Sequence, residues 1–112
     1  MTIPTEATRP LCDEEGYLID PAEWTDSVAA RIARQENITL TDEHRAVLRF
    51  MRAYFEEHHV APDARHVIRF LSIELRHEAK AKSVLFALFP YGYVKQACKI
   101  AGMRRPRAWS TG

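Results

Sequence analysis

Apolar residues recur at helical spacing along most of this chain, which predicts a mostly helical protein. The clearest stripe lies between Thr41 and Pro62, where apolar residues follow the order i, i+1, i+4, i+7, i+8: Val47, Leu48, Met51, Tyr54 and Phe55. This order places them all on one side of a helix. We therefore expect an amphipathic helix that Thr39 or Thr41 caps and that Pro62 ends, because proline cannot continue a helix.

An earlier helix is predicted from Asp20 to Asn37. Asp20 can cap it, Pro21 suits the first helical turn, and Glu23 stands where a capping-box acid belongs. Apolar residues at every fourth position mark its buried face: Trp24, Val28 and Ile32. The spacing therefore predicts that Trp24 packs as part of this helix.

Three shorter helices complete the pattern. One opens at Pro62, one begins near Ser83, and the last extends from about Tyr93 to Ala101. Gly102 then suits a left-handed C-cap. Their apolar faces are, in turn, Val67, Ile68, Leu71 and Leu75; Val84, Leu85, Leu88 and Phe89; and Val94, Ala97, Cys98 and Ala101.

The N-terminal part carries no helical period. Residues 10–19 place an acidic turn with Gly16 between two short apolar pieces, which predicts a small β hairpin. Residues 1–9 are expected to form a flexible tail, and residues 103–112 an extended C-terminal arm. A lone hairpin is marginal in water, so it has to pack on helices. The expected fold class is α+β and mostly helical, a hairpin on a bundle of about five helices.

Composition and charge add one asymmetry to this picture. The 112 residues, 46% of them hydrophobic and 28% charged, fit one domain over residues 1–112. The formal charge of +1 hides a gradient: residues 1–26 carry seven acids and one arginine, whereas seven basic residues and no acid follow Glu78. The basic C-terminal third suits an anionic ligand, an acidic partner or the acidic N-terminus of the chain itself.

No apolar run approaches the roughly 18–20 residues that span a bilayer, and the N-terminus lacks the order of a secretory signal. We therefore expect a cytoplasmic protein with no membrane partner. In a reducing compartment two cysteines separated by 85 intervening residues are poor candidates for a disulfide, so Cys12 and Cys98 are treated as individual thiols.

Most catalytic and cofactor motifs are absent. Glu74, His77 and Glu78 share a helical face, but a carboxylate-bridged metal site needs a second such set, which the sequence lacks. There is also no Gly-rich phosphate loop, no Gly-x-Ser-x-Gly and no Cys-x-x-Cys. We expect neither metal nor cofactor, and hydrolase, kinase and zinc-ribbon functions have no support.

Cys98 is the residue with the most chemical promise. Lys95 and Lys99 lie near it in sequence and favour its reactive thiolate form. The helix dipole opposes an anion in the last turns of a helix by typically about 0.3–1 kcal/mol. These effects are similar in size, so Cys98 can equally be a small apolar residue of the inner face. Cys12 follows no such pattern: the adjacent acids disfavour its thiolate, which suggests a packing role.

Four ordered stretches carry a family resemblance: residues 88–102 (LFPYGYVKQACKIAG), residues 13–18 (DEEGYL) with Trp24 downstream, residues 40–44 (LTDEH), and residues 54–57 (YFEE) leading into residues 60–62 (VAP) and Arg65. Together they resemble the DsrC/TusE/RspA family of sulfur-trafficking proteins. The resemblance implies a small hairpin or meander on about five helices, with a mobile C-terminal arm.

The resemblance also implies roles for cysteines. In sulfur-carrying members a cysteine near the end of the arm takes up sulfur as a persulfide and delivers it to a partner such as a sulfite reductase or a tRNA-thiolation enzyme. Cys98 matches a second, earlier cysteine that the DsrC members have. The position of the terminal carrier is occupied by Trp109. This departure is similar to the RspA-type branch, whose members are regulatory.

Three functions follow as expectations. The first is a non-enzymatic, regulatory or partner-binding protein of sulfur metabolism, with Cys98 as a redox or persulfide sensor. The second is a TusE-like sulfurtransferase with Cys98 as its persulfide site, which requires an accessible Cys98. The third is a DNA-binding regulator that uses the basic C-terminal third and the helix pair at Pro62. The expected partner- or anion-binding residues are Arg65, Lys95, Lys99, Arg104, Arg105, Arg107 and Trp109.

Overall fold

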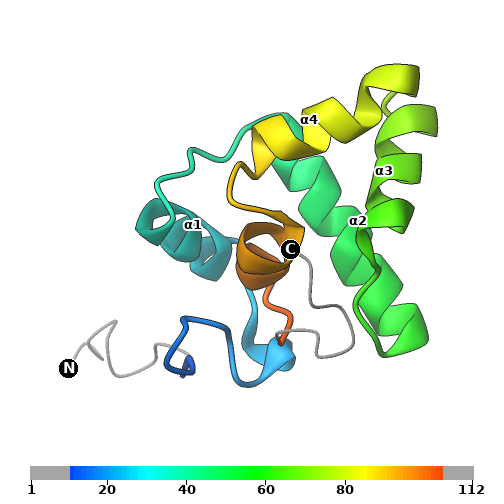
Figure 1. The fold of residues 1–112 in the computed structure, drawn as a ribbon. Coiled ribbons are helices and arrows are strands. Elements are labelled where there is room, and N and C mark those ends of the chain that lie inside the picture. Colours follow the sequence, from blue (N-terminus) through cyan, green and yellow to red (C-terminus); the bar gives the residue numbers. More distant parts are fainter. Residues whose placement is uncertain (1–10, 105–112) are drawn as a thin grey trace.

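A computed structural model describes residues 11–104 of the chain (Figure 1). Its elements are η2 (Pro21–Glu23), α1 (Asp26–Gln35), α2 (Asp42–His58), α3 (Ala64–Ile73), η3 (Glu78–Lys80), α4 (Ala81–Leu88) and the π-helix η4 (Tyr93–Cys98). The helix expected between Thr41 and Pro62 is present as α2, and the last predicted helix is present as η4 with one further helical turn. None of the described helices is long and apolar enough to cross a membrane.

The helix starts follow from capping side chains. Thr25 accepts a hydrogen bond from an amide of α1, Asp63 does the same for α3, and Thr41 forms a capping box with His44 at α2. Ser83 caps nothing and lies inside α4. The helix predicted over residues 20–37 is present as α1, with Val28 and Ile32 buried, but its predicted start is wrong. Asp20 caps only the short η2, and Trp24 then adopts an extended backbone before α1 begins.

The predicted α+β class is also wrong, because residues 11–104 contain no β-strand. An isolated antiparallel bridge joins Cys12 and Leu18, and Asp13 accepts hydrogen bonds at 2.9 Å from the amides of Glu15 and Tyr17 within the turn. A half-buried strand requires alternate residues to face the core. Tyr17 and Leu18 are consecutive and both buried, so the segment folds inward as a turn and does not extend into a ladder.

The last helix lies at the centre of the molecule, between α1 and α2 (Figure 1, orange). Its inward residues are fully buried: Ala97, Cys98, Ile100 and Ala101 are each 0% exposed. They pack in a single core with residues from every α-helix, among them Ile32, Met51, Leu71 and Leu85. The segment that carries the family motif is therefore the middle of the core.

Candidate functional site

Cys98 stands at the end of η4 with no exposed surface. Its thiol lies within hydrogen-bonding reach of the Tyr93 hydroxyl. Burial raises the pKa of Cys98 to about 12, and the hydrogen bond with Tyr93 offsets only part of that effect. The sequence left open whether Cys98 is an accessible thiolate. In the structure it is not, because the thiol is buried and its pKa is raised.

The π-helical turn explains why Tyr93 and Cys98 meet. Residues five apart point about 140° away from each other on an α-helix but stack in a π-helix, whose hydrogen bonds join i and i+5. With an α-helical period over residues 93–101, Tyr93 is expected only to begin the last helix. No residue pattern in this segment distinguishes a π-helical turn from an α-helical one, so the sequence could not place Tyr93 beside Cys98.

Several hydrogen bonds hold the end of the last helix in place. The Trp24 indole N–H donates to the Ile100 carbonyl at 2.8 Å. The Arg52 guanidinium donates to the Ala101 carbonyl at 3.2 Å and lies 4.9 Å from the Trp24 ring centroid. The amide of Met103 donates to the Cys98 carbonyl at 2.9 Å, which completes a glycine-type C-cap at Gly102. We call these five residues 24, 52 and 101–103 the C-terminal latch.

The two lysines near Cys98 point away from it, into a cleft of about 440 Å³ beside Tyr17, Glu36 and Tyr91. Lys99 pairs with Glu36 at 2.9 Å, and both side chains are largely buried. Lys95 is exposed at the rim. One of the two predicted anion-binding lysines is therefore neutralised by a carboxylate, and Lys95 remains the exposed cation of the cleft.

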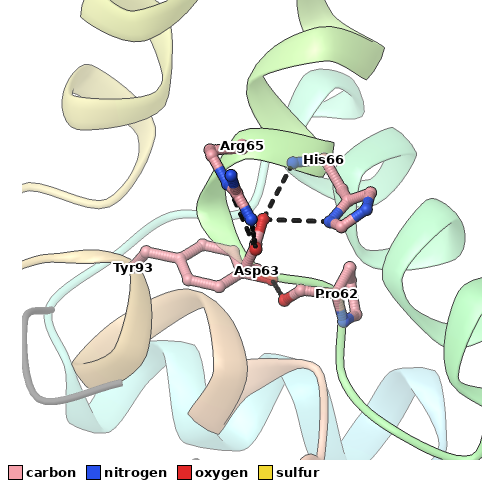
Figure 2. Close-up of polar contacts among 5 residues, drawn as sticks. All are labelled: Pro62, Asp63, Arg65, His66 and Tyr93. Carbon is pink, nitrogen blue, oxygen red and sulfur yellow. Dashed lines mark hydrogen bonds and ion pairs between the residues drawn. The ribbon is translucent and has the colours of Figure 1, made fainter. Parts of the chain in front are cut away.

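Arg65 lies apart from this cleft, at the first turn of α3 (Figure 2). Its guanidinium donates twice to Asp63, at 2.9 and 3.3 Å, and His66 contacts the other carboxylate oxygen at 2.9 Å. The paired guanidinium and the cap hydrogen bonds hold the pKa of Asp63 below its usual value. The charge of Arg65 is thus already engaged, although its side chain is 88% exposed.

The remaining predicted site residues lie at the end of the described residues 11–104 or outside them. Arg104 is exposed, and Arg105, Arg107 and Trp109 lie outside the described residues, as do the predicted tail and most of the predicted arm. Cys12 is exposed in the N-terminal turn. Among residues 11–104 no three potential ligands gather into a metal site.

The exposed position of Cys12 and the buried position of Cys98 predict that the two thiols react at different rates. Iodoacetamide should modify Cys12 of the native protein rapidly and Cys98 at least about 100-fold more slowly, because labelling of a buried group requires local opening. Peptide mass spectrometry over a time course measures both rates, and the protein in urea provides the rate without burial. Equal native rates for the two cysteines would contradict the buried position of Cys98.

A family model described as "DsrC like protein" matches residues 5–108. The chain belongs to this family. A sulfurtransferase TusE of Yersinia pseudotuberculosis is 38% identical over 94 residues, 84% of this chain and 87% of its own. A TusE of Photorhabdus laumondii is 37% identical over the same share of this chain and 85% of its own.

Solved structures of the DsrC-like family share the fold. The solution structure of Allochromatium vinosum DsrC matches with a TM-score of 0.76 and 42% identity, over 85% of each chain. The crystal structure of the oxidised gamma subunit of the dissimilatory sulfite reductase, DsrC from Archaeoglobus fulgidus, matches with a TM-score of 0.78 and 35% identity, over 87% of this chain and 89% of its own. The family expected from the sequence motifs is confirmed.

Proposed function

We propose that this protein is a sulfur-relay protein of the TusE kind, with Cys98 as its sulfur-accepting thiol. The observation that carries the proposal is the 38% identity to a named sulfurtransferase over 84% of the chain. The family match over residues 5–108 includes the motif around Cys98. The relatives' names favour sulfur transfer over the regulatory role expected from Trp109.

The transfer step is a thiol–persulfide exchange. The Cys98 thiolate forms a bond to the outer sulfur of a donor persulfide, and the sulfur–sulfur bond of the donor breaks. The donor leaves as a thiolate that takes up the proton lost by Cys98, so no external oxidant or reductant is needed. A second exchange of the same kind passes the sulfur to an acceptor thiol.

Burial imposes a condition on this step. With a pKa of about 12, only about one Cys98 in 10⁵ is a thiolate at neutral pH, and the buried sulfur has no path to a donor. Sulfur uptake therefore requires the structure around Cys98 to open locally, so an exchange that a partner assists should be faster than a spontaneous one. A permanently exposed carrier on the body of the protein is inconsistent with the buried Cys98.

The proposed partner is a sulfur-relay or sulfite-reductase-like protein, since the relatives carry those names. The exposed Lys95 at the cleft suits an acidic surface on such a partner. DNA binding receives no support from the relatives' names. The cytoplasmic location stays a prediction.

Intact-mass spectrometry tests the function directly. The protein, Cys12→Ser and Cys98→Ser are incubated with a cysteine desulfurase and cysteine, and each is weighed for the addition of one sulfur atom. We expect the protein and Cys12→Ser to gain sulfur and Cys98→Ser to gain none. If sulfur were added to Cys12 alone, the assignment of the accepting thiol to Cys98 would be wrong. If none of the three proteins gained sulfur, the regulatory function would be favoured instead.

A further inference from the structure

Tyr91 lies in the turn between α4 and the last helix and is 74% exposed to solvent. No other large hydrophobic residue among residues 11–104 is more exposed. Single exposed hydrophobic residues are common on protein surfaces and indicate nothing by themselves. Tyrosine, however, is among the residues that contribute most of the energy of protein–protein binding. Whether Tyr91 suits binding depends on how its turn is held.

The backbone of Tyr91 is fixed by a buried side chain. The Tyr91 amide donates to Oε1 of Gln96 at 2.9 Å, and the Gly92 amide donates to the Phe89 carbonyl at 3.0 Å. Gln96 is fully buried, and its Nε2 donates to Glu36 at 3.3 Å. Burying an amide is costly unless its polar atoms are bonded, and both ends of this amide hold the turn against the end of α1. A tyrosine presented from a fixed backbone loses little conformational entropy when a partner covers it.

The cleft beside Tyr91 defines the charge of this surface. Lys95 lines the same cleft and is exposed. The other lysine of the cleft, Lys99, is paired with Glu36, and Glu15 has an interaction of its own. No acid follows Lys95 in the sequence or lies between it and Tyr91. Lys95 therefore suits a carboxylate that a partner supplies.

We propose that Tyr91 and Lys95 form the docking site for the protein that donates sulfur to Cys98. The partner covers the Tyr91 ring with an apolar pocket and places a carboxylate against Lys95. The site lies at the start of the helix that ends with Cys98, so a docked donor is next to the segment that has to open. The identity of the partner as a sulfur donor rests on the proposed function, whereas the docking geometry does not.

Binding to a cysteine desulfurase, measured by biolayer interferometry without cysteine, tests the docking site in the absence of sulfur transfer. Tyr91→Ala should raise the Kd at least about tenfold at every salt concentration, because it removes the apolar anchor. Lys95→Ala should raise the Kd about threefold at low salt and leave it unchanged at about 0.5 M salt, where charges are screened.

Two exposed residues away from the cleft provide matched controls. Val60→Ala truncates an exposed apolar side chain before α3, and Lys82→Ala removes an exposed charge at the start of α4. Both should leave the Kd within about twofold of the parent. Circular dichroism confirms that each variant is folded, and Tyr91→Phe, which keeps the ring, should bind nearly as tightly as the parent.

Sulfur uptake from two donors separates docking from chemistry. Glutathione persulfide is small and needs no docking site, whereas the desulfurase with cysteine presents its persulfide on a protein. Tyr91→Ala should slow uptake from the desulfurase at least about tenfold and uptake from glutathione persulfide by less than about twofold. Slower uptake from both donors would show that Tyr91 acts on Cys98 itself and would overturn the docking site.

Three binding results also overturn the proposal: a parent that does not bind the desulfurase, a Tyr91→Ala variant that binds as tightly as the parent, and control variants that are equally weakened. A parent that sediments as a dimer, with Tyr91→Ala a monomer, would instead assign Tyr91 to a contact between copies of this chain. Binding that depends on Tyr91 without any sulfur uptake removes the proposed function and keeps the docking site. Uptake from glutathione persulfide with binding that ignores Tyr91 does the reverse.

Discussion

Gly102→Ala is expected to destabilise the protein by about 3 kcal/mol and to expose Cys98. The added Cβ would lie 2.4 Å from Cδ1 and 2.8 Å from Cγ of Trp24, in a residue whose φ is +78°. A left-handed backbone costs an alanine about 1 kcal/mol, and overpacking a rigid indole adds about 1–3 kcal/mol. Trp24 cannot move without losing its hydrogen bond to Ile100.

Gly16→Ala is the matched control for this prediction. Its φ is +92°, but the nearest atom to a new Cβ is the flexible Lys99 side chain at 3.7 Å. Gly16→Ala should therefore lose only the about 1 kcal/mol of stability that a left-handed backbone costs an alanine. Urea unfolding followed by circular dichroism gives both free energies, and iodoacetamide labelling should accelerate at Cys98 in Gly102→Ala alone. Equal losses in the two variants would show that the Trp24 contact contributes nothing.

Arg52→Ala is expected to cost about 2–3 kcal/mol and to release the C-terminal latch. The guanidinium donates to the Ala101 carbonyl at 3.2 Å and to the Pro21 carbonyl at 3.0 Å, and it also stacks on Trp24. Burial lowers the pKa of Arg52 from its ordinary value and the Glu56 carboxylate offsets only part of this effect, so the carbonyls and rings stabilise a partly desolvated charge. Hydrogen bonds that involve a charged group are worth about 1.5–3 kcal/mol.

Arg52→Lys separates charge from geometry. An ammonium group keeps the charge, but it cannot bridge the two carbonyls with a planar fork. We expect Arg52→Lys to lose about half as much stability as Arg52→Ala, and both to speed the labelling of Cys98. Urea unfolding and the labelling assay measure the two effects. A lysine variant as stable as the parent would show that charge alone holds the helix end.

The sequence predicted those elements whose residues follow a local rule. The apolar stripe of α2, its cap at Thr41 and the left-handed Gly102 depend on neighbours within a few positions. The N-terminal turn departs from its predicted hairpin because Tyr17 and Leu18 both pack inward, a tertiary effect that local alternation does not encode. Trp24 departs from its predicted helix for a similar reason, since its indole bonds a carbonyl 76 positions away.

The candidate site was predictable only in part. The motif around Cys98 identified the thiol, because family motifs preserve residue types in order. Its burial and its contact with Tyr93 depend on a π-helical turn and on a latch assembled from distant segments. The positive charge of Lys99 could be predicted from the sequence. Its ion pair with Glu36 could not, because it forms only when α1 and the last helix pack together.

The central position of the last helix also sets the order in which the protein can fold. This helix follows the other described helices in the chain, yet it fills the middle of their shared core. During synthesis, α1 to α4 emerge before residues 93–103 and cannot complete their shared core without them. Cys98 is therefore covered only once the last helix has packed between the others.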